Sequence, residues 1–269
     1  MSHPQWGITV LMTTHERPHL LRRALRSVLE QEQTDLPVHI VLVSDAVCAQ
    51  TDAVASQCLR PQDTYLRRSG PAGPARSRNL AQQFVHTSHY VFLDDDDSWT
   101  PGYLQKLAPY LRAQPDTVFY TDVIWVTEEA GASELPTVSS TQTISLAGRQ
   151  QEHLFYKNFL PNNCLVYPHG CARQHHTDET LKSQEDWEYV LSVAAVRALV
   201  HLPVAGVCVH KRGADTQHRG SSADAKNTHI VADYLHIYRK WPAPNPHIQQ
   251  ARQKLLAGVW PAVPPMPWF

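Results

Sequence analysis

Continuous apolar runs alternate with amphipathic segments through the first hundred residues of the chain. Buried strands are predicted for residues 8–13, 38–43, 64–67 and 90–93. Helices are predicted between them, over residues 18–32, 50–58 and 75–85. Because the strands are apolar throughout rather than alternating, the pattern indicates a parallel sheet covered on both faces. We therefore predict an α/β fold with a mostly parallel central sheet flanked by helices.

The second half of the chain is less regular. Strands are predicted for residues 117–126 and 163–167, and helices for residues 151–159 and 184–199. The stretch 127–150 is rich in Gly, Ser and Thr, which favours a loop or a hairpin. Residues 242–269 form a proline-rich tail with one short helical segment, residues 248–258. We expect this tail to wrap the protein surface or an oligomer partner.

Composition excludes several classes of protein. The net charge of −1 and the pI near 7.0 indicate no bulk attraction to nucleic acid or to an anionic membrane. The local group Arg22, Arg23 and Arg26 is expected to be the solvated face of a helix. Five cysteines without a Cys-x-x-Cys pair fit reduced thiols in a cytosol. With no secretory signal or membrane-length apolar run, we predict a cytoplasmic protein, with peripheral contact at the inner face of the membrane left open.

The feature with the most chemistry is an acidic run that follows a predicted strand. Tyr90 to Leu93 are apolar, and Asp94 to Asp97 are four adjacent carboxylates. Like charges repel one another, and a divalent cation would relieve that repulsion. Carboxylates at alternate positions can share one hard cation that keeps sites for phosphate oxygens. The alternative interpretation is a solvated acidic turn.

Polar residues also follow two other predicted strands. Thr13 and Thr14 end the first strand, and Asp45 follows the second. In open parallel sheets, ligands bind outside the carboxyl ends of the strands. Three polar strand ends at one edge therefore favour a nucleotide-sized site.

Several segments together resemble family 2 glycosyltransferases of the GT-A fold. They are residues 8–18, 41–45, 73–81, 92–99, 101–104 and 184–188, in the order typical of that family. The chain departs from the usual motifs at Ser44, at His15 and Glu16, and in the sequence Ala-Arg-Ser-Arg-Asn at residues 75–79. Because of that last departure, either Arg76 or Arg78 can make the expected nucleotide contact.

The resemblance implies a metal-dependent, inverting transfer of one sugar from a nucleotide-sugar, with UDP-sugars favoured. It implies one GT-A domain over residues 1–241, with a nucleotide-sugar half, 1–100, and an acceptor and catalytic half, 101–241. The implied acceptor is a glycan or a lipid-linked glycan in surface polysaccharide or glycoconjugate synthesis. Nucleic acid is not an expected partner.

The resemblance also gives roles to the acidic residues. Asp96 is the first choice as a ligand of Mn²⁺ or Mg²⁺, and Asp94 is expected at the metal, at a metal-bound water or at the ribose. Asp95 is expected to join the nucleotide contacts, and Asp97 to support the metal ligand or the donor sugar. The remaining expected nucleoside and phosphate contacts are Thr13, Glu16, Asp45, Arg76 and Arg78.

Inversion needs a base opposite the leaving group, which takes the proton of the attacking hydroxyl. The resemblance makes Asp186 that base, with Glu185 holding or positioning the acceptor. The alternative is that both acids only favour a helix start. The resemblance also implies a late histidine in the metal shell, His218 first and His210 second. Trp187, like the pair Asn162 and Asn163, is either an acceptor contact or a structural residue.

Two rival interpretations remain open. An apolar strand followed by Asp-x-Asp also resembles the nucleophile loop of haloacid-dehalogenase-like phosphatases. Alternatively, the chain keeps the nucleotide-sugar fold but acts as a binding or scaffold subunit. A calcium loop is excluded, because Trp99 and Gln105 stand where glycine and the bidentate glutamate are required.

Overall fold

The computed structural model of the protein describes residues 4–31, 34–129, 135–212 and 228–259. Its central sheet has the strand order β3-β2-β1-β4-β8-β6-β9-β5, with β7 added on β6. The strands of the first half are β1 (Gln5–Thr14), β2 (Val38–Ser44), β3 (Thr64–Arg67) and β4 (Thr87–Asp94). All pairs among these four strands are parallel, which confirms the predicted α/β fold with a mostly parallel sheet.

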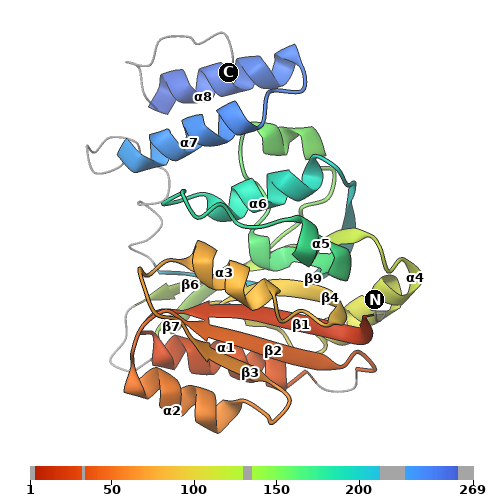
Figure 1. Ribbon diagram of the computed structural model, residues 1–269. Helices are drawn as coiled ribbons and strands as arrows, with labels where there is room; N and C mark the ends of the chain where they lie inside the picture. Colours follow the sequence, from red (N-terminus) through yellow and green to blue (C-terminus); the bar gives the residue numbers. More distant parts are fainter. Residues whose placement is uncertain (1–3, 32–33, 130–134, 213–227, 260–269) are drawn as a thin grey trace.

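Helices cover both faces of the first half. They are α1 (Pro18–Leu29), α2 (Ala49–Cys58) and α3 (Pro74–Gln82), all at predicted places. Figure 1 shows α1 and α2 on one side of the sheet and α3 on the other. The apolar positions that predicted α1 face inward, because Leu21, Ala24 and Leu25 are fully buried. Burial on both faces explains why the strand sequences carry no polar alternation.

The second half of the sheet is mixed. Its strands are β5 (Ser98–Trp99), β6 (Val118–Glu129), β7 (Thr137–Ile144), β8 (Leu165–Pro168) and β9 (Leu199–Arg212). The short β8 runs antiparallel to both β4 and β6, whereas β9 runs parallel to β6. The β6–β7 hairpin confirms one of the two alternatives for residues 127–150.

Several elements of this half were not predicted from the sequence. These are the strands β5 and β9 and the helices α4 (Tyr103–Ala113), α5 (His169–Gln174) and α7 (Thr228–Lys240). The 3₁₀ turns η1 (Gln151–Phe155) and η2 (Asn162–Cys164) and the helix α6 (Glu185–Ala194) complete it. Trp187 is a core residue, since it is fully buried and its indole N–H donates to the Leu154 carbonyl at 2.7 Å.

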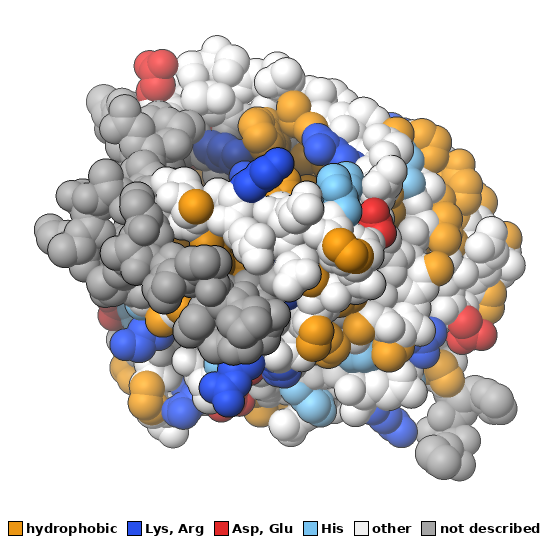
Figure 2. All heavy atoms as spheres, turned by 90° about the horizontal axis from the view of Figure 1, so that it is seen from above, with side chains coloured by type: hydrophobic (Ala, Val, Ile, Leu, Met, Phe, Trp, Pro, Cys, Tyr) orange, Lys and Arg blue, Asp and Glu red, His pale blue; other side chains and the backbone are white. Residues whose placement is uncertain are grey.

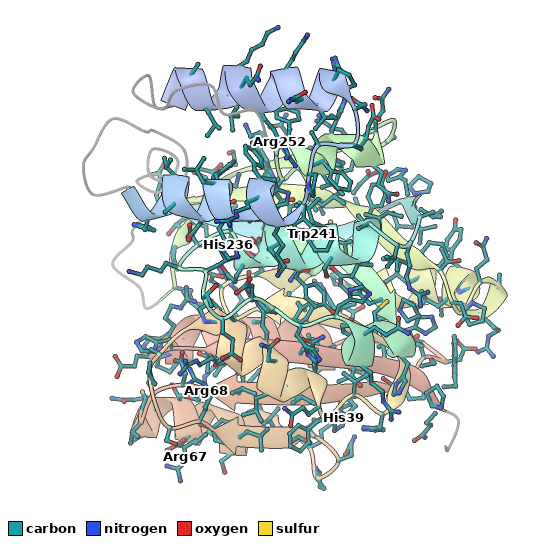
Figure 3. The ribbon with its side chains drawn as sticks, turned by 45° about the horizontal axis from the view of Figure 1, so that its top comes forward. His39, Arg67, Arg68, His236, Trp241 and Arg252 are labelled. Atoms are coloured by element: carbon teal, nitrogen blue, oxygen red, sulfur yellow. The ribbon has the colours of Figure 1, made fainter. Side chains whose placement is uncertain are left out.

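The tail helix α8 (Pro246–Val259) packs on its own chain. Arg252 is fully buried, and its guanidinium donates to the carbonyls of Phe155 at 2.6 Å and Trp241 at 2.6 Å. Figure 3 places Arg252 on α8, close to Trp241 at the end of α7. Burial lowers the pKa of Arg252 to about 10. The described part of the tail therefore packs against the rest of its own chain, which is one of the two predicted alternatives.

Figure 2 views the α7–α8 end from above and colours the side chains of the described residues by type. Lys, Arg, His and hydrophobic side chains are interspersed there. Over the described residues, none of the helices has the length and apolar character needed to cross a membrane.

Candidate active site

The acidic residues after β4 form a compact cluster at the carboxyl edge of the parallel strands. The register places Thr13 between Val43 of β2 and Asp94 of β4, so three strand ends meet at this edge as predicted. Ligand atoms of Asp94, Asp96 and Asp97 all lie within 4.8 Å of one another. This spacing suits a single divalent cation bound by oxygen.

Asp95 requires a correction. We predicted a nucleotide contact, but its side chain is fully buried. Thr14 donates a hydrogen bond to Asp95 Oδ2 at 2.6 Å, and the Arg17 guanidinium lies 2.6 Å from Oδ1. Burial raises the pKa of Asp95 to about 7, although Arg17 acts in the opposite direction. Asp95 therefore anchors the acidic loop to the end of β1.

Asp97 joins the two halves of the sheet. Its side chain is buried, and one oxygen accepts the His210 amide at 2.9 Å. The other oxygen accepts the Asn163 side-chain amide. Burial raises the pKa of Asp97 well above its usual range, and the charges of Asp94 and Asp96 raise it further. A cation at the cluster would stabilise the ionised form of Asp97.

Arg17 is a site residue that the sequence analysis did not identify. Besides its ion pair with Asp95, its guanidinium donates to Asp96 Oδ2 at 2.8 Å. Arg17 is half exposed, and the preceding Glu16 is exposed with a left-handed φ of 51°. A non-glycine residue in this conformation is uncommon and is found at turns and functional sites. The position of Arg17, directly after a parallel strand end, was the available signal.

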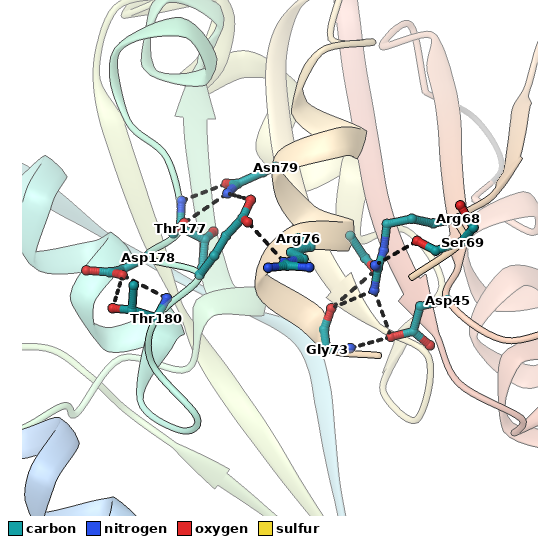
Figure 4. A network of polar contacts seen from close by, with 11 residues as sticks. Asp45, Arg68, Ser69, Gly73, Arg76, Asn79, Thr177, Asp178 and Thr180 are labelled. Carbon is teal, nitrogen blue, oxygen red and sulfur yellow. Dashed lines mark hydrogen bonds and ion pairs between the residues drawn. The ribbon is translucent and has the colours of Figure 1, made fainter. Parts of the chain in front are cut away.

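Asp45 lies at the end of β2 and is held by three donors. Its Oδ2 accepts the Gly73 amide at 2.6 Å and lies 3.4 Å from Arg68, as Figure 4 shows. Its Oδ1 lies 2.6 Å from the His15 ring. These contacts tie the β1 and β2 loops to the start of α3. The sequence analysis identified Asp45 but not His15 or Arg68.

Arg76 and Arg78, which the sequence left as alternatives, have different surroundings. Arg76 is half exposed, and its Nε donates to Glu179 at 3.1 Å. Arg78 is buried, and it donates to Glu185 at 2.7 Å and to Asp94 at 2.9 Å. Arg78 therefore links the acidic cluster directly to the first turn of α6.

Asp186, the predicted base, follows Glu185 in that turn. Burial and then the charge of Glu185 raise the pKa of Asp186 to about 6, against the effect of Arg78. Its Oδ1 accepts the Trp187 amide at 2.7 Å. A carboxylate with a pKa near 6 is ionised at neutral pH and is basic enough to accept a proton during a reaction.

The histidine predictions fare differently. His218 lies outside the described residues. For His210, a role as metal ligand is not supported, because both ring nitrogens already have partners. They lie 2.8 Å from the Ser98 hydroxyl and 2.7 Å from Glu128. Burial and the neighbouring Arg23 lower the pKa of His210.

The remaining predicted residues are placed as follows. Thr13 is partly buried at the strand end, beside Asp94 in the neighbouring strand. Asn162 and Asn163 are buried, and Asn162 accepts the Tyr167 hydroxyl at 2.9 Å. These contacts, together with the 3₁₀ turn that the pair begins, favour the structural alternative for Asn162 and Asn163.

Comparison with known proteins adds a family. The protein-family model described as "Glycosyl transferase family 2" matches residues 9–172 of the chain. The putative colanic acid biosynthesis glycosyl transferase WcaA of Escherichia coli K12 is 23% identical over 184 residues, 68% of this chain and 64% of that protein. The succinoglycan biosynthesis protein ExoW of Rhizobium meliloti is 28% identical over 195 residues, 65% of this chain and 59% of that protein. The chain spans less than two thirds of either relative.

Solved structures resemble most of the chain. The crystal structure of S. aureus TarS 1-349 in complex with UDP-GlcNAc has a TM-score of 0.62 at 17% identity. The match covers 93% of this chain and 71% of that one. At this level of identity the likeness shows the shared α/β fold.

Proposed function

Because the chain belongs to glycosyl transferase family 2, we propose that it moves one sugar from a nucleotide-sugar, with UDP-sugars favoured, to an acceptor hydroxyl with inversion. Residues 1–100 would bind the donor and residues 101–241 the acceptor. The haloacid-dehalogenase-like phosphatase interpretation is set aside by the family match.

One observation carries the proposal. The acidic cluster at the strand ends and the Glu185–Asp186 turn of α6 are joined by the buried Arg78. Donor binding and proton acceptance thus have groups at one site, drawn from both halves of the chain. A solvated acidic turn would not need a buried arginine that is shared with a second acidic pair.

The cluster fits a divalent cation, Mn²⁺ or Mg²⁺. Asp94 and Asp96 each use one oxygen in an ion pair, Asp94 with Arg78 and Asp96 with Arg17. Within the described part of the chain, the second oxygen of each carboxylate has no hydrogen-bond or ion-pair partner, and it would serve as a ligand. A bound cation would neutralise the diphosphate as it leaves.

The chain's own residues supply the other steps. Asp45 and Thr13 would line the nucleoside pocket, and Arg17 would face the phosphates beside Asp96. Asp186 would take the proton of the acceptor hydroxyl at one carboxylate oxygen, and Arg78 would hold Glu185 and Asp94 in register. Arg76, which is turned towards Glu179, is the weaker of the two arginine candidates for the nucleotide.

The relatives support an acceptor class. WcaA is described as a putative glycosyl transferase of colanic acid biosynthesis, and ExoW as a protein of succinoglycan biosynthesis. Both products are polysaccharides. We therefore propose a growing polysaccharide or lipid-linked glycan as acceptor, at the cytoplasmic side of the cell. With a membrane-bound acceptor, we expect peripheral contact of the protein with the inner membrane face.

The test is metal-dependent release of nucleoside diphosphate. The protein is incubated with UDP-GlcNAc, UDP-Glc or UDP-Gal, with Mn²⁺ or with EDTA, and UDP is measured in the presence and absence of a cell-envelope glycan fraction. We expect release with one donor that needs Mn²⁺ and rises with acceptor. UDP binding without release under any condition would favour the non-catalytic scaffold.

A further inference from the structure

A second concave site lies beside α1, away from the proposed donor contacts. This cavity has a volume of about 360 Å³ and is lined by α1, by β5 and by the segment that follows β5. Its lining includes Arg22, Arg23 and Arg26 of α1, together with Ser98 and Trp99 of β5. None of the residues that we assign to the nucleotide or the metal lines it.

The arginines of this cavity are only partly neutralised. Arg23 forms an ion pair with the buried Glu128, which corrects the expectation that it lies on a solvated helix face. Arg22 donates to the neutral side chain of Gln57 at 2.9 Å. Among the described residues, no carboxylate forms an ion pair with Arg22 or Arg26. Glu30 is the one acidic residue in the described lining, and it is exposed.

Two buried donors of the lining also lack acceptors. The Arg23 Nε and the Trp99 indole N–H are buried and have no hydrogen-bond partner in the described part of the chain. Trp99 is only 4% exposed. A buried donor without an acceptor costs free energy, and an anion that reaches it removes that cost. The arginine charges therefore favour an anionic ligand, and the two unpaired donors leave the lining with unused hydrogen-bonding capacity.

The cavity is connected to the acidic loop through Arg23. One Arg23 guanidinium nitrogen donates to the Asp96 carbonyl at 2.6 Å, and Arg23 also lines the cavity. Ser98 follows Asp97 directly and also lines it. An anion in this cavity would therefore be linked to the acidic loop through Arg23 and Ser98.

We propose that this cavity binds a phosphate group carried by a phosphate-bearing ligand, separate from the nucleotide diphosphate. Arginine suits phosphate because its planar fork of donors matches the phosphate oxygens. The volume accommodates a phosphate with a small alcohol or sugar attached. Either a soluble phosphoester or a phospholipid headgroup presents this group. The proposal goes beyond the sugar transfer and does not depend on it.

The experiment titrates the full chain, without metal, with inorganic phosphate, with glycerol 3-phosphate, and with vesicles of phosphatidylglycerol or phosphatidylcholine. It is repeated on the double variant Arg22→Gln/Arg26→Gln, on Arg26→Gln alone, and on Arg239→Gln. Arg239 is an exposed arginine of α7 outside the cavity, so its variant removes the same charge elsewhere. UDP binding with Mn²⁺ and the melting temperature are measured on every variant.

We expect saturable binding of a phosphate probe that is weaker by about tenfold or more in the double variant. It should be weakened less in Arg26→Gln and unchanged in Arg239→Gln. Binding of glycerol 3-phosphate would identify a soluble ligand, and binding only of phosphatidylglycerol vesicles a lipid headgroup. Equal binding by all variants, or no binding of any probe to the unaltered protein, would overturn the proposal. UDP binding reports the donor site independently, so the two proposals can fail separately.

Discussion

The two halves of the sheet hold their site residues in different ways. In the first half, parallel strand register alone brings Thr13 and Asp94 side by side. In the second half, Glu185 and Asp186 begin a helix, and it is Arg78 from the first half that ties them to the acidic cluster. Strand ends are thus positioned by the backbone, whereas the α6 acids are positioned by a side-chain contact between distant segments.

This difference suggests that the two halves have separate roles, one in binding and one in the chemical step. In the proposed function, the strand-end half would bind a nucleotide and a cation, and the α6 half would supply Asp186, whose pKa is raised. Changes in the first half should therefore affect binding, and changes in the second half should affect the chemical step.

Replacement of the base should have the largest effect on rate. Asp186→Asn keeps the shape of the side chain but cannot accept the proton, so we expect kcat to fall about 10²- to 10⁴-fold. UDP binding should stay within about twofold, because Asp186 is not a nucleotide contact in this account. Steady-state kinetics and calorimetry on the same sample check both values.

Asp116→Asn is the matched control for that change. Asp116 is an exposed acid outside the site, so its variant should keep both rate and binding. If Asp186→Asn instead retained full activity, the assignment of the base to α6 would be wrong.

The packing of the second half can be tested at Gly206 of β9. A Cβ there would lie 2.0 Å from a ring carbon of Tyr103, which is 1% exposed and cannot easily move. We expect Gly206→Ala to destabilise the protein by about 1–3 kcal/mol. Gly258→Ala, where a Cβ meets nothing within 4 Å, should be neutral or slightly stabilising. Denaturant unfolding measures the pair, and equal stability of the two variants would contradict the described packing.

The link between the halves should show in the pH dependence of activity. Asp186 acts only when deprotonated, so activity should rise with pH through its pKa of about 6. Arg78 lowers that pKa, so Arg78→Gln should move the rise to higher pH and reduce kcat at pH 6 roughly threefold to tenfold. Arg76→Gln, in the same helix, should leave the profile in place. A profile that moves in Arg76→Gln and not in Arg78→Gln would reverse the two assignments.

The sequence was sufficient where the backbone decides position. Apolar runs predicted β1, β2 and β4, and parallel register then brought their polar ends together. The sequence was insufficient for Asp94 to Asp97, because these four adjacent aspartates are identical in sequence but their side chains point in different directions. Asp95 turns inward to Thr14 and Arg17, whereas Asp94 and Asp96 face the cluster.

Contacts between distant segments were also beyond the sequence. His210 resembled a metal ligand, but its ring is already held by Ser98 and Glu128. Asn163 bonds Asp97 across 66 residues, and no local pattern signals such a pair. Short elements such as β5 exist only because β9 provides their hydrogen bonds.

The most direct test of the account is calorimetric titration with UDP, GDP and dTDP, each with and without Mn²⁺, on the unaltered protein and on Asp96→Ala. We expect that one nucleotide, UDP in the favoured case, binds in a metal-dependent manner and that the variant loses this binding. Failure of every nucleotide to bind, or equal binding by Asp96→Ala, would contradict the assignment of the acidic cluster as the donor site.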